Sequence, residues 1–158
     1  MNIEAWYFNN FESKISGRYI TLEHIKPLLK KYKSNFEISN IGVSELGKDI
    51  PMITIGNGTK KVLAWSQMHG NESTTTKAIF DFLKLLSQKD DFKDDIRNFY
   101  KNYTLCVIPI LNPDGASLYT RNNANDVDLN RDAQKLSQKE SVSLMDVFHQ
   151  LKPDLCLN

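Results

Sequence analysis

The sequence has little of what would mark a secreted, membrane or nucleic-acid-binding protein. Its 158 residues include only two cysteines, and the net charge is +1 at pH 7. A charge so close to zero gives no electrostatic reason to expect nucleic acid or an acidic membrane as a partner. No apolar run is long enough to span a membrane, and the first residues lack the basic and apolar regions of a secretory signal. We therefore expect a globular cytoplasmic protein.

The two cysteines, Cys106 and Cys156, each lie inside an apolar run. Such positions are typical of small buried residues in a reducing compartment. A disulfide between them is the alternative if their strands are neighbours, although their spacing fits no framework of secreted proteins.

The chain is expected to form a single domain, with a helical cover at 1–34 and a sheet core at 35–158. A helical spacing of apolar residues predicts a first helix that ends near Gly17. The residues of this pattern are Phe8, Phe11 and Ile15. A second helix should begin after Thr21 and bury one face, with Pro27 either kinking it or delaying its start. The residues of that face are Leu22, Ile25, Leu28, Leu29 and Tyr32.

Strands and a helix are expected to alternate in the next part of the chain. Two strand-like segments, 36–43 and 50–55, flank the turn at 46–49 and predict a hairpin. A third strand at 61–65 leads through a short turn into a helix at 73–87. The apolar residues of that helix recur at helical spacing, which predicts that one of its faces is buried. They are Ile79, Phe82, Leu83 and Leu86.

A nearly continuous apolar segment at 103–111 predicts a strand buried on both faces. It ends in the turn sequence Asn112-Pro113-Asp114-Gly115, and a long polar loop follows at 116–135. A capping box at 137–140 should open another helix that stops before Pro153. The residues expected to be buried on this helix are Leu144, Met145, Phe148 and Leu151.

A further apolar strand begins at Asp154, and the sequence ends inside it. Crossovers of helical length between strands imply parallel pairing with helices on both faces of the sheet. The expected fold is therefore α/β, with a mixed, largely parallel sheet, an N-terminal hairpin and helices on both faces. Because the sequence stops inside a strand, we expect the domain to be truncated, and its open edge or apolar face would favour self-association.

The turn after the third strand contains His69-Gly70-Asn71-Glu72. Imidazole and carboxylate are both zinc ligands, and their separation lets one turn direct both side chains at one ion. The turn should lie at the carboxyl edge of the sheet, where open α/β sheets bind ligands. A His-x-x-Glu pattern also occurs by chance, so the rest of the chain must support this interpretation.

The polar loop is the second place where chemistry is expected, since loops this long in compact domains are usually functional. Its two arginines, Arg121 and Arg131, have planar guanidinium groups that match a carboxylate. Asp128 could orient a metal-bound histidine through the second ring nitrogen. Runs of Asn and Asp are also ordinary turn formers, so the loop alone allows a purely structural interpretation.

Taken together, these segments resemble the zinc carboxypeptidase family, the carboxypeptidase A-like metallopeptidases. The resemblance begins near Ile38 and extends to the end of the chain. The motifs that match in order and spacing are His69-Gly70-Asn71-Glu72, Asn112-Pro113-Asp114-Gly115, Arg121 and Asp128-Leu129-Asn130-Arg131. The resemblance implies Zn²⁺ as the cofactor and hydrolysis of a C-terminal peptide bond by zinc-activated water.

The resemblance also implies a role for each candidate residue. His69 and Glu72 would be zinc ligands, and Asp128 would orient the histidine. Arg121 would be the catalytic residue that polarises the scissile carbonyl and stabilises the oxyanion. The residues that would bind the terminal carboxylate of the substrate are Asn130 and Arg131. The Asn112–Gly115 motif is interpreted as architecture that sets up the arginine loop.

Two parts of the family pattern have no counterpart before Asn158: the third zinc ligand and the general base. His24 and His149 lie in expected helices, and Glu140 belongs to the expected capping box, so none is a convincing replacement. The chain therefore resembles the N-terminal half of the catalytic domain and is expected to be inactive alone.

Two alternatives to a carboxypeptidase remain open. The first is a zinc-dependent deacylase or amidohydrolase of the aspartoacylase or murein peptide amidase type, whose substrate would be an N-acyl amino acid or a cell-wall peptide. The second is a non-catalytic binding domain that retains the fold. In both enzyme readings the expected partner is a peptide or N-acyl amino acid with a free C-terminal carboxylate.

Overall fold

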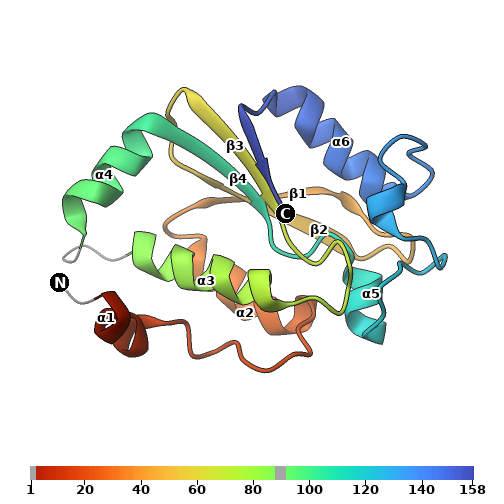
Figure 1. Cartoon of the computed structure of the whole chain (residues 1–158), viewed down its shortest axis with the longest axis horizontal. Helices are drawn as coiled ribbons and strands as arrows, with labels where there is room; N and C mark the ends of the chain where they lie inside the picture. The colour runs from red at the N-terminus through yellow and green to blue at the C-terminus, as the bar shows by residue number, and fades with distance from the viewer. Residues whose placement is uncertain (1–2, 88–91) are drawn as a thin grey trace.

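The computed structural model describes residues 3–87 and 92–158 (Figure 1). The helices are α1 (Ile3–Asn10), α2 (Leu22–Tyr32), α3 (Thr74–Leu86), α4 (Lys93–Asn102), α5 (Pro113–Leu118), the short 3-10 helix η1 (Leu129–Arg131) and α6 (Lys139–Leu151). The strands are β1 (Glu37–Val43), β2 (Asp49–Ile55), β3 (Lys60–Trp65), β4 (Tyr103–Ile108) and β5 (Leu155–Leu157). In the described part of the chain, no helix is both long and apolar enough to cross a membrane.

The strands form one mixed sheet in the order β1-β2-β4-β3-β5. The expected hairpin is present, because β1 pairs with β2 in antiparallel orientation, and β2 pairs with β4 in the same way. β3 lies parallel to both β4 and β5. These three parallel strands bring their carboxyl ends to one edge of the sheet, where the β3–α3 and β4–α5 connections meet.

Helices cover both faces of the sheet, as the crossovers predicted (Figure 1). One hydrophobic cluster joins α2 and α3 to the sheet and contains Ile53, Phe80 and Leu83, all fully buried. The other cluster packs α6 against the opposite face through Leu144 and Val147. Burial of each such side chain contributes about 1.5–3 kcal/mol, so the two clusters fix the sheet on which the site is built.

The second expected helix is confirmed and the first is not. α2 begins after Thr21, whose backbone N–H donates to His24 Nδ1 at 3.1 Å, so His24 is a capping residue. Pro27 lies inside α2 and does not delay its start. α1 ends at Asn10, well before Gly17, and Phe8 is exposed. The Asn10 side chain donates to the carbonyl of Trp6 at 2.8 Å, a local side-chain contact at the end of α1 that the spacing of apolar residues did not reveal.

The second half corrects several further expectations. α4 (Lys93–Asn102) was not predicted, because its sequence is mostly polar and buries only Ile96. Asn112–Gly115 is the start of α5 and not a simple turn, with Asn112 Oδ1 accepting the Gly115 N–H at 2.8 Å. The predicted strand at 103–111 ends at Ile108.

The capping box at 137–140 is wrong. The N-cap of α6 is Gln138, and Glu140 is fully buried with partners elsewhere in the chain. On the same helix Phe148 is exposed and Val147 is buried, so the apolar face is rotated from the expected one. Cys106 is buried as expected, whereas Cys156 is exposed on β5.

Candidate metal and substrate site

The turn between β3 and α3 is held by a buried glutamine. Gln67 adopts a positive φ of 46°, which is uncommon for a residue with a side chain. Its Nε2 donates to the Gly70 carbonyl at 2.7 Å and to the Ile20 carbonyl at 3.0 Å. Its Oε1 accepts the hydroxyl of Thr76 at 2.7 Å. These bonds over-determine the turn, so the strained backbone persists and the residues that follow have a fixed direction.

The β3–α3 turn and the polar loop at 116–135 are hydrogen-bonded to each other. The Gly70 N–H donates to the Arg121 carbonyl at 3.3 Å, and the Asn71 N–H donates to the Thr120 carbonyl at 3.1 Å. A Cβ atom added at Gly70 would lie 2.0 Å from the carbonyl carbon of Gly115, so only glycine allows this approach. Two segments about fifty residues apart in sequence therefore form one rigid surface.

The Asn112 side chain contacts both of these segments. It is fully buried, and its Nδ2 lies 3.4 Å from the Met68 carbonyl and 3.4 Å from the Arg121 carbonyl. Its Oδ1 simultaneously caps α5. The architectural interpretation of the Asn112–Gly115 motif is consistent with these contacts, since one side chain links the β3–α3 turn, the loop that carries Arg121 and α5.

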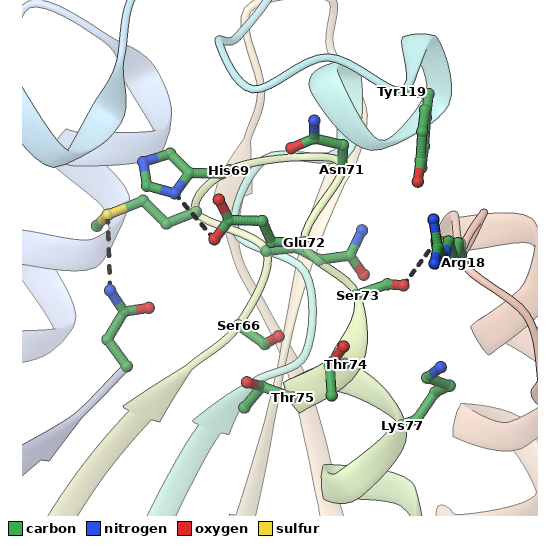
Figure 2. A pocket seen from close by; sticks show the side chains of 13 residues that line it. Arg18, Ser66, His69, Asn71, Glu72, Ser73, Thr74, Thr75, Lys77 and Tyr119 are labelled. Atoms are coloured by element: carbon green, nitrogen blue, oxygen red, sulfur yellow. Dashed lines mark hydrogen bonds and ion pairs between the residues drawn. The ribbon is translucent and has the colours of Figure 1, made fainter.

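His69 lies between two carboxylates. Its Nδ1 is 3.2 Å from Glu72 Oε2, and its Nε2 is 3.1 Å from Asp128 Oδ1. Figure 2 shows the His69 and Glu72 side chains facing each other across the opening of the turn. A carboxylate on Nε2 favours a proton on that nitrogen and leaves the Nδ1 lone pair directed towards Glu72. The structure therefore brings His69, Glu72 and Asp128 together in one cluster.

Arg121 completes this cluster. Its Nη1 is 3.2 Å from Glu72 Oε1, while Nε and Nη2 are each 3.2 Å from Asp128 Oδ2. Partial burial raises the pKa of Asp128, but hydrogen bonds from the Asn130 N–H, His69 and Arg121 outweigh it and hold that pKa below its ordinary value. Asp128 is therefore a carboxylate at neutral pH.

Asn130 and Arg131 lie in η1, directly after Asp128. The Asn130 N–H donates to Asp128 Oδ1 at 2.9 Å, which starts the short helix. Both residues are exposed. Among the residues that the structure describes, neither side chain bonds to the cluster. Asn130 and Arg131 thus directly follow a residue of the cluster in sequence, and their exposed side chains are accessible to a ligand.

A buried polar network, which local sequence patterns did not predict, anchors the loop that carries these residues. Asn123 Nδ2 donates to Gln138 Oε1 at 2.8 Å and contacts Glu140 Oε2 at 3.3 Å. Glu140 Oε1 accepts the Glu45 N–H at 3.3 Å. Burial raises the pKa of Glu140. The network ties the loop to the β1–β2 turn and to α6, and only the run of asparagines hinted at such fixed polar contacts.

A cavity of about 530 Å³ opens beside the cluster (Figure 2). His69, Asn71 and Glu72 line one part of it. Asn71 Oδ1 is buried and has no hydrogen-bond partner in the described part of the chain. A buried acceptor without a partner is costly, so this atom marks a position where the N–H of a bound peptide would be favoured.

The donor chemistry fits a metal ion in part. Neutral imidazole nitrogen and carboxylate oxygen are ligands that zinc prefers, and His69 and Glu72 present one of each from a single turn. Within residues 3–87 and 92–158, no group of three or more His, Cys, Asp or Glu is placed to hold a metal ion. His69 and Glu72 can therefore supply two positions of a zinc site. His149 lies at the exposed end of α6.

Comparison of the sequence with known proteins places the chain in one family. The family model described as zinc carboxypeptidase matches residues 21–152. Gamma-D-glutamyl-L-diamino acid endopeptidase 1 of Lysinibacillus sphaericus is 36% identical over 83 residues, which are 49% of this chain and 21% of that protein. Carboxypeptidase SOL1 of Arabidopsis thaliana is 30% identical over 131 residues, covering 75% of this chain and 26% of that protein.

A solved structure shows the same fold. The metallo-carboxypeptidase from Burkholderia cenocepacia superposes with a TM-score of 0.79 at 23% identity, over 87% of this chain and 40% of that one. The chain therefore spans well under half the length of the relatives that it matches.

Proposed function

The chain belongs to the zinc carboxypeptidase family, and on that premise we propose that it supplies zinc-binding and carboxylate-binding residues of a metallocarboxypeptidase. The substrate would be a peptide with a free C-terminal carboxylate, and the reaction would be hydrolysis of its last peptide bond. One observation carries this proposal: His69 has Glu72 at one ring nitrogen and Asp128 at the other.

His69 and Glu72 would hold the zinc ion. When bound, zinc supplies Lewis-acid chemistry and makes water reactive at neutral pH. Asp128 holds a proton on Nε2 of His69, so that Nδ1 stays free as a ligand atom. Its ionised state follows from the hydrogen bonds that lower its pKa.

Arg121 would act on the substrate. Its guanidinium group is half-exposed and lies against Glu72 and Asp128, beside the proposed ligands. A cation in this position stabilises negative charge that develops on a carbonyl oxygen more than it stabilises the neutral carbonyl. Asn130 and Arg131 would bind the terminal carboxylate and so fix which peptide bond reaches the cluster.

A second candidate function is cleavage of a γ-D-glutamyl bond in a cell-wall peptide. The observation in its favour is the 36% identity to the gamma-D-glutamyl-L-diamino acid endopeptidase, which exceeds the 30% identity to the carboxypeptidase. The site chemistry would be the same, and the two candidates differ in the acyl group of the substrate. A γ-linked glutamyl residue keeps its α-carboxylate free next to the scissile bond.

The test uses the zinc-loaded protein and two forms of one short peptide, with a free and with an amidated C-terminus. We expect the free form to bind more tightly, and Arg131→Ala to weaken it by about tenfold while leaving the amidated form nearly unchanged. Lys135→Ala is the control, because Lys135 is an exposed cation further along the same loop. An equal effect of Arg131→Ala on both forms would contradict the carboxylate role. A tripeptide with a γ-D-glutamyl bond, compared with its α-linked isomer, separates the two candidate functions.

A further inference from the structure

One wall of the cavity beside the cluster is cationic. Arg18, from the segment between α1 and α2, and Lys77, from α3, line the same cavity as His69 and Glu72 (Figure 2). Glu72 is the only acidic residue among the described residues that line it, and its carboxylate already contacts His69 and Arg121. The wall around Arg18 and Lys77 therefore has a local excess of positive charge.

The segment that carries Arg18 is held in place by three side chains, which come from the β3–α3 turn and from α3. Ser73 Oγ donates to the Arg18 carbonyl at 2.6 Å, and Lys77 Nζ donates to the Gly17 carbonyl at 2.9 Å. Gln67 Nε2 donates to the Ile20 carbonyl at 3.0 Å. Ser73 occupies the N-cap of α3, yet its hydroxyl makes this long-range bond and no side-chain cap. The segment at 17–20 is thus held in place by the same turn that carries the proposed zinc ligands.

The charge of Arg18 is not neutralised within the protein. In the described ranges Arg97 pairs with Asp94 and Arg121 pairs with Asp128, whereas Arg18 forms no ion pair, as is also true of the carboxylate-binding candidate Arg131. Asn71 Oδ1, on the same cavity, is a buried acceptor without a partner. Both observations indicate that the cavity accommodates a ligand offering an anionic group and an N–H donor.

Arg18 and Lys77 lie on the opposite side of Glu72 from His69 (Figure 2). η1, which carries Arg131, directly follows Asp128, and Asp128 contacts the ring nitrogen of His69 that faces away from Glu72. A peptide whose C-terminus is held near η1 and whose scissile bond lies at His69 and Glu72 extends towards Arg18. The groups that reach Arg18 are those on the N-terminal side of the scissile bond.

We infer that Arg18 and Lys77 form a cationic subsite that selects substrates with a carboxylate on the N-terminal side of the scissile bond. This rests on the proposed function, because the direction of the substrate is set by the carboxylate-binding role of Asn130 and Arg131. Arg18 lies just before residues 21–152, the range that the family model matches. The subsite determines specificity and takes no part in bond cleavage.

The test measures binding of two acylated dipeptides to the zinc-loaded chain by calorimetry. Both have a free C-terminus, and their penultimate residue is glutamate in one and glutamine in the other. We expect the glutamate peptide to bind about five- to tenfold more tightly, as a partly exposed ion pair allows. Arg18→Gln and Lys77→Gln should each reduce that preference, and Arg18→Glu should reverse it. Lys14→Gln is the matched control, since Lys14 is an exposed cation in the same segment outside the cavity.

The outcomes separate the subsite from the proposed function. Equal affinity for both peptides, or a preference that survives Arg18→Glu, would overturn the subsite and leave the proposed function intact. Binding of neither peptide would overturn both. Circular dichroism of each variant shows that it is folded, and the Arg18 carbonyl that accepts from Ser73 is unchanged by these substitutions.

Discussion

Nε2 of His69 lies 3.1 Å from Oδ1 of Asp128, although the two residues are 59 positions apart in the sequence. The contact joins the β3–α3 turn to the loop that carries Arg121 and η1. A carboxylate at Nε2 favours a proton on that nitrogen, which leaves the lone pair of Nδ1 on the side of Glu72. The chemistry proposed for the site depends on this contact.

Asp128→Asn should weaken zinc binding by about 10- to 100-fold, because the amide no longer fixes the tautomer and orientation of His69. Competition with a chromophoric chelator measures the affinity. Asp126→Asn is the control, since Asp126 is an exposed residue of the same loop. Unchanged zinc affinity in Asp128→Asn would show that this contact is not needed to orient the ligand.

Gly70→Ala should destabilise the protein by at least about 3 kcal/mol, because the added methyl group would collide with the backbone of Gly115. Gly47→Ala should cost only about 1–2 kcal/mol, since Gly47 has open space around it and only its φ of 78° is unfavourable for alanine. Denaturant unfolding of both variants measures the difference. A smaller loss for Gly70→Ala than for Gly47→Ala would show that the two backbone segments do not approach as closely as the structure indicates.

Glu140 should make the stability of the protein depend on pH. Burial raises its pKa in the folded state, so Glu140 contributes most to stability below its unfolded pKa of about 4.3, and that contribution is lost as pH rises through the folded value. Replacing it with glutamine removes the titration. The free energy of unfolding of Glu140→Gln should therefore increase relative to that of the wild type as pH rises above about 4.3.

The matched control for this experiment is Glu37→Gln, which changes an exposed glutamate on β1. Its stability relative to wild type should stay nearly constant over the same pH range. If the difference in unfolding free energy between Glu140→Gln and wild type does not change with pH, Glu140 titrates like an exposed carboxylate. The network would then not bury this side chain as the structure indicates.

Much of the fold followed from the sequence, because local patterns were decisive there. The apolar face of α2, the β1–β2 hairpin and the parallel strands followed from hydrophobic spacing and turn residues. The expectations failed where distant contacts took over. Glu140 matched a local capping pattern, but its partners are Glu45 and Asn123, and capping is only one of the uses of such a residue.

The sequence singles out the candidate residues His69, Glu72, Arg121 and Asp128, but most of their contacts could not be predicted from it. The motifs around His69 and Asp128 stand out in the sequence, yet nothing local indicates that Arg121 contacts both Glu72 and Asp128. Arg18 gave no sequence signal at all, because its place beside the site depends on long-range bonds such as the one from Ser73. Side chains that act through tertiary contacts have no periodicity by which they could be found.

The most direct test of the proposed metal site is a zinc titration of the wild-type chain and of two histidine variants, with calorimetry as the detection method. We predict that the wild-type chain binds zinc weakly, because its described residues offer only two ligands, and that His69→Ala loses this binding. His149→Ala should retain it, because His149 lies at the exposed end of α6. Zinc binding that is unchanged in His69→Ala, or lost in His149→Ala, would contradict the assignment of His69 and Glu72 as the metal ligands.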